Sequence, residues 1–324
     1  MASSEPLISI LMAVYEPPPD WLREQLISLN VQNYPNLRLY IRDDASHIDS
    51  FALLQRMAAS CITAFPYTVQ RNERNLGSNE TFQRLTEEAE GDYFAYCDQD
   101  DVWLPHKITA ERAALESTGA LLVCADAEII DANGRKKADS IKRVRRHHRF
   151  YSGSGLASRL LVSNFAIGCT LLVRAEQAKA ALPFCPYMVH DQYLAFFCAT
   201  KGDICSISSP LIRYRIHGVN QTLGMPGVHD RGSYYKLRVE QLSLRLEWLQ
   251  ERYGTSPELA REIALARAWI DARKRNFLGD KSARKIIWKY RRFSPLTSLF
   301  ELVMVHAPEK LFMFFVILKR NNII

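Results

Sequence analysis

The chain has 324 residues, of which 48% are apolar, and it carries a net charge of +7 with a pI near 9.0. This length accommodates one large α/β domain with an appendage, or two domains, and the apolar content is sufficient for a sizeable core. No apolar segment reaches the roughly 18 residues that would span a bilayer, so the sequence predicts a globular fold and excludes a membrane-spanning one. The positive charge suits a nucleic acid and an anionic membrane surface equally well, so its distribution must decide between them.

The cysteines and the amino terminus indicate the compartment. The seven cysteines contain no Cys-x-x-Cys pair, their number is odd, and most lie in apolar runs. This pattern is typical of buried thiols in a reducing cytosol. The amino terminus has no basic region, so we expect no secretory signal and a cytoplasmic location.

Strands alternate with helices in the first part of the chain. Residues 7–15 form a nearly continuous apolar run, as expected of a strand buried on both faces of a parallel sheet. After three prolines, apolar residues recur at helical spacing from Trp21 to Leu29. Further strands are predicted at 37–42 and 67–71, and further helices at about 50–60 and 78–90. The alternation predicts right-handed βαβ crossovers and a mostly parallel sheet.

An acidic stretch follows the next predicted strand, Tyr93–Cys97. Asp98, Asp100 and Asp101 fall within four positions. Packed together, these carboxylates raise each other's pKa unless a cation keeps them ionised. Mg²⁺ or Mn²⁺ fits, because a hard metal prefers carboxylate oxygens and completes its shell with substrate phosphates. The alternative is a solvated acidic turn. The adjacent apolar Trp103 favours a position at the rim of a cleft.

The middle of the chain changes in composition. A strand ending at Ile130 and a turn at 131–134 are predicted before residues 135–149, which hold eight Lys or Arg, two His and one Asp. We expect a mobile loop there, either merely solvated or gripping an anionic substrate. Residues 165–173 read as another buried strand, and Gly168-Cys169-Thr170 in its middle permits close backbone approach.

From about Gly232 the pattern is helical to the end, with helix boundaries at Gly254 and Gly279. A basic run at 281–292 is interleaved with apolar and aromatic residues, and two short apolar segments follow at 296–305 and 311–318. Such basic amphipathic helices can lie peripherally on the anionic inner face of the plasma membrane. A packed helical tail or a homo-oligomer contact is the rival interpretation. We therefore expect a first domain at 1–228 and a helical region at 229–324.

Chemically active residue types follow the predicted strands or lie in loops that a parallel sheet would gather at one edge. They are Ala13-Val14-Tyr15-Glu16, Asp43-Asp44, Asp98-Gln99-Asp100-Asp101 and His190-Asp191. Together with Asn75-Leu76-Gly77, and in this order, they resemble the inverting family 2 glycosyltransferases over residues 6–224. That resemblance implies a GT-A fold: an α/β domain with a single mostly parallel sheet flanked by helices, which binds a nucleotide sugar, here followed by a C-terminal helical extension.

The resemblance also implies roles for individual residues. Tyr15 and Asp44 would line the base and ribose pocket, with Asp44 accepting from the pyrimidine N3–H. Asp98 and Asp100 would bind the metal that bridges the two phosphates, and Asp191 would be the general base that takes the proton of the acceptor hydroxyl. The residues implied to contact the donor are Ala13, Tyr15, Glu16, Asp44, Asn75, Asp98, Gln99, Arg213 and Arg215. Those implied at the acceptor or transferred sugar are Asp101, Trp103, Gly168, Cys169 and His190.

A later segment points to a subgroup. Arg213-Tyr214-Arg215-Ile216-His217-Gly218-Val219-Asn220-Gln221 resembles a segment of bacterial rhamnosyltransferase-like members, in which Asp-Gln-Asp-Asp-Val-Trp also recurs. It implies that Arg213 or Arg215 neutralises phosphate, and that His217 either completes the metal shell or is structural. His190, where many relatives have Glu, either orients Asp191 or is a surface residue. Ala45 stands where the family commonly has Gly, so the sequence does not determine the conformation of that turn.

The leading hypothesis is an inverting, metal-dependent glycosyltransferase that moves rhamnose from dTDP-rhamnose to a cell-surface glycan or lipid-linked saccharide. The alternatives are another donor, such as a UDP-hexose or UDP-galactofuranose, or a non-catalytic scaffold that binds nucleotide sugars. A nucleotidyltransferase needs a Gly-rich, Lys-containing phosphate loop after the first strand, which residues 15–19 do not supply. A nucleic-acid-binding protein would interleave stacking aromatics with residues 135–149, which have them only at their end, so we expect no nucleic-acid partner.

Overall fold

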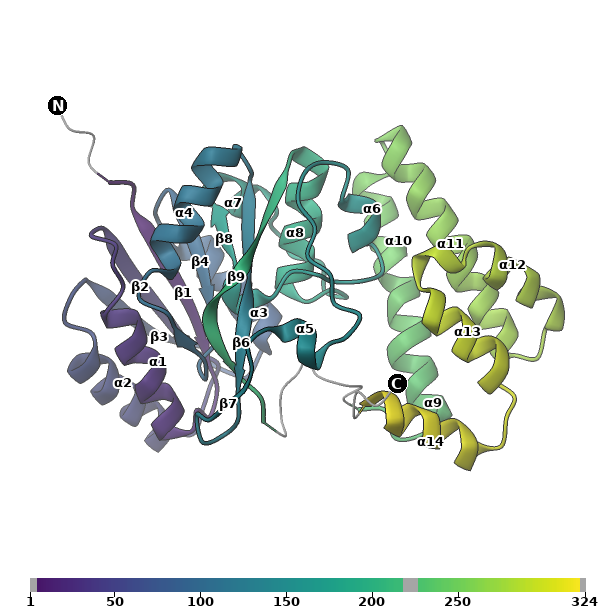
Figure 1. Ribbon diagram of the computed structural model, residues 1–324, viewed down its shortest axis with the longest axis horizontal. Coiled ribbons are helices and arrows are strands. Elements are labelled where there is room, and N and C mark those ends of the chain that lie inside the picture. The colour runs from purple at the N-terminus through teal and green to yellow at the C-terminus, as the bar shows by residue number, and fades with distance from the viewer. Residues whose placement is uncertain (1–4, 218–226, 321–324) are drawn as a thin grey trace. The chain divides into compact units, whose positions relative to one another are not determined.

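The computed structural model describes residues 5–217 and 227–320, so Gly218-Val219-Asn220-Gln221 of the segment noted above lies outside the described residues. The described chain divides into two units (Figure 1). The first contains the described residues of 1–156, 165–184 and 189–217. The second contains those of 157–164, 185–188 and 218–324.

A mixed β-sheet forms the centre of the first unit. Among the described residues nine strands join it, in the order β3-β2-β1-β4-β8-β6-β9-β5, with β7 paired to β6. The strands are β1 (Ile8–Val14), β2 (Leu37–Asp43), β3 (Tyr67–Arg71), β4 (Tyr93–Cys97), β5 (Val102–Trp103), β6 (Leu122–Ile130), β7 (Lys136–Ala138), β8 (Leu172–Arg174) and β9 (Ile204–Arg215). β3, β2, β1 and β4 pair in parallel, and so do β6 and β9, while the other pairs are antiparallel. The expected parallel arrangement thus holds for the first four strands, and the sheet as a whole is mixed.

Helices connect these strands, and the first three lie where the sequence predicted helices. They are α1 (Pro19–Asn30), α2 (Ile48–Cys61), α3 (Ser78–Glu88), α4 (Lys107–Thr118), α7 (Ala175–Ala180) and α8 (His190–Lys201). α1 begins at a proline, whose missing N–H costs nothing in the first helical turn. Leu22, Leu26 and Leu29 form its buried face, as their spacing indicated. The parallel strands and their crossover helices therefore bring the carboxyl ends of β1, β2 and β4 to one edge of the sheet.

Two expectations for the middle of the chain are wrong. Residues 165–173 are not one strand: Gly168–Thr170 is a 3₁₀ turn, and only Leu172–Arg174 pairs in the sheet. The Thr170 hydroxyl donates to the Ile167 carbonyl at 2.8 Å, a local bond that competes with strand pairing.

Residues 135–149 are not a structureless loop either, because they contain β7 and the short helix α5 (Ile141–Val144). Asp126 is buried on β6 and accepts hydrogen bonds from the Ser140 hydroxyl at 2.5 Å and the Ile141 amide at 3.1 Å. These bonds tie the start of α5 to the sheet, an interaction that composition alone did not indicate.

The second unit is helical, as the pattern from Gly232 predicted. Its helices are α6 (Ala157–Leu160), α9 (Arg231–Tyr235), α10 (Gln241–Tyr253), α11 (Pro257–Phe277), α12 (Arg284–Lys289), α13 (Pro295–Met304) and α14 (Glu309–Arg320). In its core the Arg273 guanidinium donates to the Glu301 carboxylate at 2.7 Å, and the Tyr234 hydroxyl donates to the same carboxylate at 2.9 Å. Among the described residues, no helix combines the length and the apolar character needed to span a bilayer.

Candidate active site

Four carboxylates gather beyond the carboxyl end of β4. Asp98, Asp100 and Asp101 follow the strand directly, and Asp191 lies in the first turn of α8. Burial, followed by the charges of Asp100 and Asp191, raises the pKa of Asp98 to about 7. Burial and the charges of Asp100 and Asp98 raise the pKa of Asp101 well above its usual range. The cluster therefore has an excess of negative charge that is costly to bury.

Two of these carboxylates fit a divalent metal. The side-chain ligand atoms of Asp98, Asp101 and Cys169 all lie within 4.8 Å of one another. Asp101 Oδ1 accepts from the Arg215 amide at 2.9 Å, whereas Oδ2 is buried and has no hydrogen-bond partner in the described chain. A hard cation such as Mg²⁺ prefers carboxylate oxygens of this kind. The Cys169 thiol is a soft ligand, and burial keeps its pKa well above the usual range, so it fits such an ion poorly.

Asp100 faces the end of β9 instead. His217 Nε2 lies 2.7 Å from Asp100 Oδ2, so the structure brings these two predicted metal ligands together. The imidazole also packs on the Trp21 indole, with ring centroids 4.8 Å apart. Trp21 was not among the predicted site residues. Trp21 and Glu24 are three residues apart and therefore lie on one face of α1, the helix that follows the first strand. This spacing is the sequence signal that could have identified Trp21.

The two arginines of the β9 segment have different surroundings. Arg215 is 1% exposed, forms an ion pair with Glu24, and donates through Nε to the Asp100 carbonyl at 2.8 Å. It therefore holds the backbone of the acidic loop from within the protein. The Arg213 side chain is 50% exposed and lies 3.7 Å from Glu128, so this arginine is accessible to solvent.

Gly168 allows the 3₁₀ turn to approach the start of α8 closely. A Cβ at this position would lie 3.2 Å from His190 Nε2 and 3.4 Å from Asp191 Oδ2. Asp191 Oδ1 accepts from the Gln192 amide at 2.6 Å, which fixes the carboxylate in the first turn of the helix. The structure thus brings Gly168, Cys169, His190 and Asp191 together with the acidic loop.

His190 lies in an apolar environment. It is 8% exposed and stacks on Phe82, with ring centroids 4.0 Å apart, and on Tyr96 at 5.4 Å. Burial lowers the pKa of His190 to about 3, so the imidazole is neutral at physiological pH. Its Nε2 atom has no hydrogen-bond partner among the described residues. His190 is therefore not a surface residue.

The end of β1 is joined to the acidic loop by an amide pairing. The Tyr15 amide donates to Gln99 Oε1 at 2.7 Å, and Gln99 Nε2 donates to the Tyr15 carbonyl at 3.0 Å. The Tyr15 residue is 49% exposed and directly follows β1, on which Ala13 is the second-last residue. These two bonds place an accessible aromatic ring beside the carboxylates.

Glu16 is engaged at the start of α2. Its carboxylate accepts from the His47 amide and, at 2.7 Å, from the Ser50 hydroxyl. These two hydrogen bonds, that from His47 first, lower the pKa of Glu16. Glu16 itself adopts φ 42°, in the left-handed region. Its side chain therefore organises the turn after β1.

Asp44 binds the loop that contains Asn75. Its Oδ1 accepts from the Leu76 amide at 2.7 Å, and its Oδ2 accepts from the Gly77 amide at 2.8 Å. Both oxygens of this buried carboxylate are thus engaged by the chain, while Asn75 is exposed. Ala45 adopts φ 60°, so the turn keeps a glycine-like conformation at a cost of about 1–2 kcal/mol. Because Asp44 Oδ2 accepts only one of these bonds, the expected contact between Asp44 and a pyrimidine stays a prediction.

Trp103 lies in the interior and not at a rim. It is 1% exposed, and the Lys107 ammonium lies 3.9 Å from the centroid of its ring. Lys107 is fully buried and pairs with Glu111 at 2.7 Å. The indole therefore supports this buried ion pair, and its burial gives no support to a contact with a sugar.

Comparison with known families agrees with this arrangement. The model of "Glycosyl transferase family 2" matches residues 9–180, which is more than half of the chain. The chain belongs to glycosyl transferase family 2. The match covers β1 to β4, the acidic loop and the 3₁₀ turn at Gly168, and it confirms the family that the order of motifs indicated.

Two relatives illustrate how distant the similar sequences are. The dTDP-rhamnosyl transferase RfbG of Shigella flexneri is 22% identical over 289 residues, which cover 84% of this glycosyltransferase and 91% of the relative. An uncharacterised glycosyltransferase of Methanocaldococcus jannaschii is 27% identical over 245 residues, covering 72% of this chain and 79% of the relative. These similarities support a transferase, at the level of the family.

Solved structures share the fold. TarS 1–349 of S. aureus, in complex with UDP-GlcNAc, superposes with a TM-score of 0.58 and 14% identity, covering 98% of this chain and 88% of that one. The mannosyltransferase PcManGT of Pyrobaculum calidifontis, in complex with GDP-Man and Mn²⁺, gives 0.57 and 16%, covering 99% and 86%. The expected GT-A fold with a helical C-terminal region is therefore confirmed.

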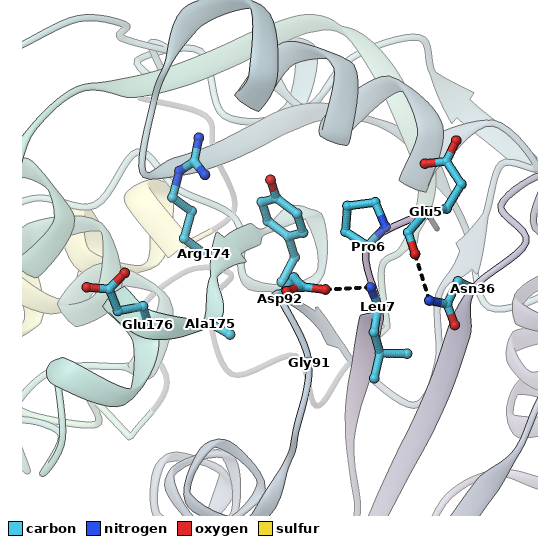
Figure 2. Close-up of a pocket in the computed structure, with 10 residues that line it drawn as sticks. Glu5, Pro6, Leu7, Asn36, Gly91, Asp92, Arg174, Ala175 and Glu176 are labelled. Carbon is cyan, nitrogen blue, oxygen red and sulfur yellow. Dashed lines mark hydrogen bonds between the residues drawn. The ribbon is translucent and has the colours of Figure 1, made fainter. Parts of the chain in front are cut away.

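A hollow of about 730 Å³ lies at the opposite edge of the sheet of this glycosyltransferase (Figure 2). It is lined by residues at the starts of β1, β2 and β4 and by residues 174–176, where β8 leads into α7. In Figure 2 the Asp92 carboxylate accepts from the Leu7 amide at 2.7 Å. Because β1 and β4 are parallel, their amino ends lie a strand length away from the acidic loop. The hollow shares no residue with the candidate active site.

Proposed function

We propose that this glycosyltransferase transfers a sugar with inversion and with the help of a divalent metal. The observation that carries the proposal is the gathering of Asp98, Asp100, Asp101 and Asp191 at one edge of the sheet. A site for neutral ligands alone would gain nothing from so much uncompensated negative charge. The same charge suits a cation and, through it, a diphosphate leaving group.

Asp98 and Asp101 are the residues that would hold Mg²⁺ or Mn²⁺. Their proximity and the unpartnered Oδ2 atom of Asp101 support this role. When bound, the ion supplies positive charge that stabilises the departing nucleoside diphosphate. The complex of PcManGT with GDP-Man and Mn²⁺ is consistent with this cofactor class. Asp100, held by His217, is the third carboxylate available beside them.

Asp191 would act as the general base. It removes the proton from an acceptor hydroxyl while that oxygen forms a bond to the anomeric carbon and the bond to the diphosphate breaks. The neighbouring His190 is neutral and buried, so it provides no competing positive charge. A side chain at position 168 would crowd Asp191 Oδ2, so the glycine supports the approach of an acceptor to this carboxylate.

We propose dTDP-rhamnose as the donor, and a hydroxyl of a cell-surface glycan or lipid-linked saccharide as the acceptor. The name of the Shigella flexneri relative, which aligns over most of both chains, supports this donor. The exposed Tyr15 beside the acidic loop supports stacking of a nucleotide base. The cysteines form no disulfide in the described chain and are mostly buried, which supports a reducing, cytoplasmic location.

The test is a calorimetric titration with dTDP-rhamnose, UDP-hexoses, UDP-galactofuranose and GDP-mannose, with and without Mn²⁺, combined with an assay of slow donor hydrolysis. We expect metal-dependent binding of dTDP-rhamnose, which Asp98→Asn and Asp100→Ala abolish. The matched control is Asp92→Asn, at the other end of the same strand, which should leave binding unchanged. Selection of another donor would change the proposed sugar and leave the proposed transfer mechanism in place. Binding of a nucleotide sugar without hydrolysis or transfer would favour a non-catalytic scaffold. No binding of any nucleotide sugar in the presence of metal would overturn the transfer mechanism.

A further inference from the structure

Helix α13 exposes an apolar stripe. Leu296, Leu299 and Val303 are 52%, 53% and 63% exposed, and their spacing of three and four residues places them on one face of the helix. The opposite face is occupied by the fold, because Ser298, Glu301 and Met304 are buried. Helix α13 is therefore packed against the protein through one face, and it exposes leucine and valine to solvent on the other.

Helix α14 repeats this arrangement. Leu311, Phe314 and Ile317 are 45%, 54% and 48% exposed and recur every third residue. The buried side is anchored by Phe312, whose ring centroid lies 5.3 Å from that of Phe300 on α13. Two consecutive helices thus each bury one face and expose large apolar side chains on the other. Apolar surface of this extent usually marks a contact with something outside the chain.

Exposed cations accompany these stripes. Lys281, Lys285, Lys289, Arg291 and Lys310 are exposed, and none of them forms an ion pair within the described residues. Trp288 lies among them, 52% exposed, with the Arg291 guanidinium 4.3 Å from the centroid of its ring. The acidic residues nearby are already neutralised, since Asp280 pairs with Arg275, and Glu309 with Arg231. The segment from α12 to α14 therefore carries exposed cations that no acidic residue compensates within the described part of the chain.

We propose that α12, α13 and α14 dock this glycosyltransferase on an anionic phospholipid surface. Apolar stripes flanked by unpaired lysines and arginines, with a tryptophan among them, match the boundary between acyl chains and anionic headgroups. The helices have 6, 10 and 12 residues, so they lie on the bilayer and do not cross it. A second copy of the chain fits less well, because a two-fold contact through this surface would bring two sets of unpaired cations together. Binding of the donor does not depend on this surface.

Cosedimentation of the full chain with vesicles tests the proposal. We expect binding to phosphatidylcholine vesicles that contain about 30% phosphatidylglycerol, and at least tenfold weaker binding to pure phosphatidylcholine. Lys285→Gln with Lys289→Gln should weaken binding to the anionic vesicles by about fivefold for each charge removed, an effect that high salt should mask. Leu299→Ser with Phe314→Ser should weaken it at least tenfold in both low and high salt.

The matched control is Ile27→Ser with Val31→Ser, which removes two similarly exposed apolar side chains from α1 and the residue that follows it, and should leave vesicle binding unchanged. All the substituted residues are exposed, so the variants should keep the thermal transition of the original chain. Absence of binding to anionic vesicles would overturn the proposal. If light scattering showed a dimer that Leu299→Ser with Phe314→Ser converts to a monomer, while vesicles bound neither form, the surface would be a contact between copies.

Discussion

Both units of the molecule bury charged side chains, but the buried charge is paired in the second unit and lies among like charges in the first. In the second unit, Glu301 accepts two bonds from Arg273 and one from Tyr234. Burial lowers the pKa of Arg273, but Glu301 outweighs this effect and the pKa is raised, as in a well-formed ion pair. In the first unit, Asp98 and Asp101 lie beside two further carboxylates, and their pKa values are raised.

The difference separates charge that holds the fold from charge that is available for a ligand. The carboxylate of Glu301 is satisfied by the protein itself, and the same is true of Asp44 with its two backbone amides. Asp101 retains an oxygen without a partner in the described chain, although it is buried. Native proteins rarely leave such an atom unsatisfied without a functional reason. The candidate site is thus distinguished by this unpartnered oxygen together with the charges of the neighbouring Asp98 and Asp100.

The largest expected effect is on catalysis. Asp191→Asn keeps the shape and the bond to the Gln192 amide but removes the proton acceptor. We expect kcat to fall by about 10²–10⁴, the usual contribution of a general base, with donor affinity within about twofold of the original. Steady-state kinetics and donor titration on the same preparation separate the two quantities. A variant that retained more than a tenth of kcat would exclude Asp191 as the base.

Replacement of the paired charge should instead affect stability. Arg273→Leu leaves Glu301 buried without its cation, which typically costs about 3–5 kcal/mol in free energy of unfolding. The double variant Arg273→Leu with Glu301→Leu should recover most of this loss, because the uncompensated charge is gone. Urea unfolding of the three proteins measures both steps.

In the metal-free protein, Asp98→Asn should not lower the free energy of unfolding, since it relieves the repulsion between the carboxylates. A loss of several kcal/mol there would contradict the distinction between the two regions.

Much of the fold was predictable because local signals determine it. The apolar runs predicted β1 and β4, and the chain direction of parallel strands predicted that their carboxyl ends would share an edge. The acidic loop after Cys97 and the helical character after Gly232 followed in the same way. Where a strand continues directly into polar residues, sequence order alone places those residues at the edge of the sheet.

The details of the site were not predictable because they depend on contacts between distant segments. The two carboxylate oxygens of Asp44 are engaged by amides more than thirty residues away, at Leu76 and Gly77. Trp103 faces the buried Lys107, a pairing that an apolar residue beside an acidic loop does not reveal. Gly168 meets Asp191 only because a 3₁₀ turn interrupts the expected strand.

The smallest of the three effects concerns His190, a buried base without a charged partner. Its pKa is lowered by burial to about 3, whereas an unfolded chain has a value near 6.5. Between these values the unfolded state binds a proton that the folded state does not, so stability should fall as the pH falls below about 6.5. The slope is about 1.4 kcal/mol per pH unit, and the full contribution is present above that pH.

His190→Phe keeps an aromatic ring between Phe82 and Tyr96 and removes the titration. Urea unfolding at pH 7.5, 6.0 and 5.0 should therefore show a shallower loss of stability for the variant than for the original protein. Parallel curves would mean that His190 is protonated in the folded state, next to the carboxylates. The imidazole would then compensate part of their charge, and the contrast between a satisfied core and an unsatisfied site would be weaker than the geometry indicates.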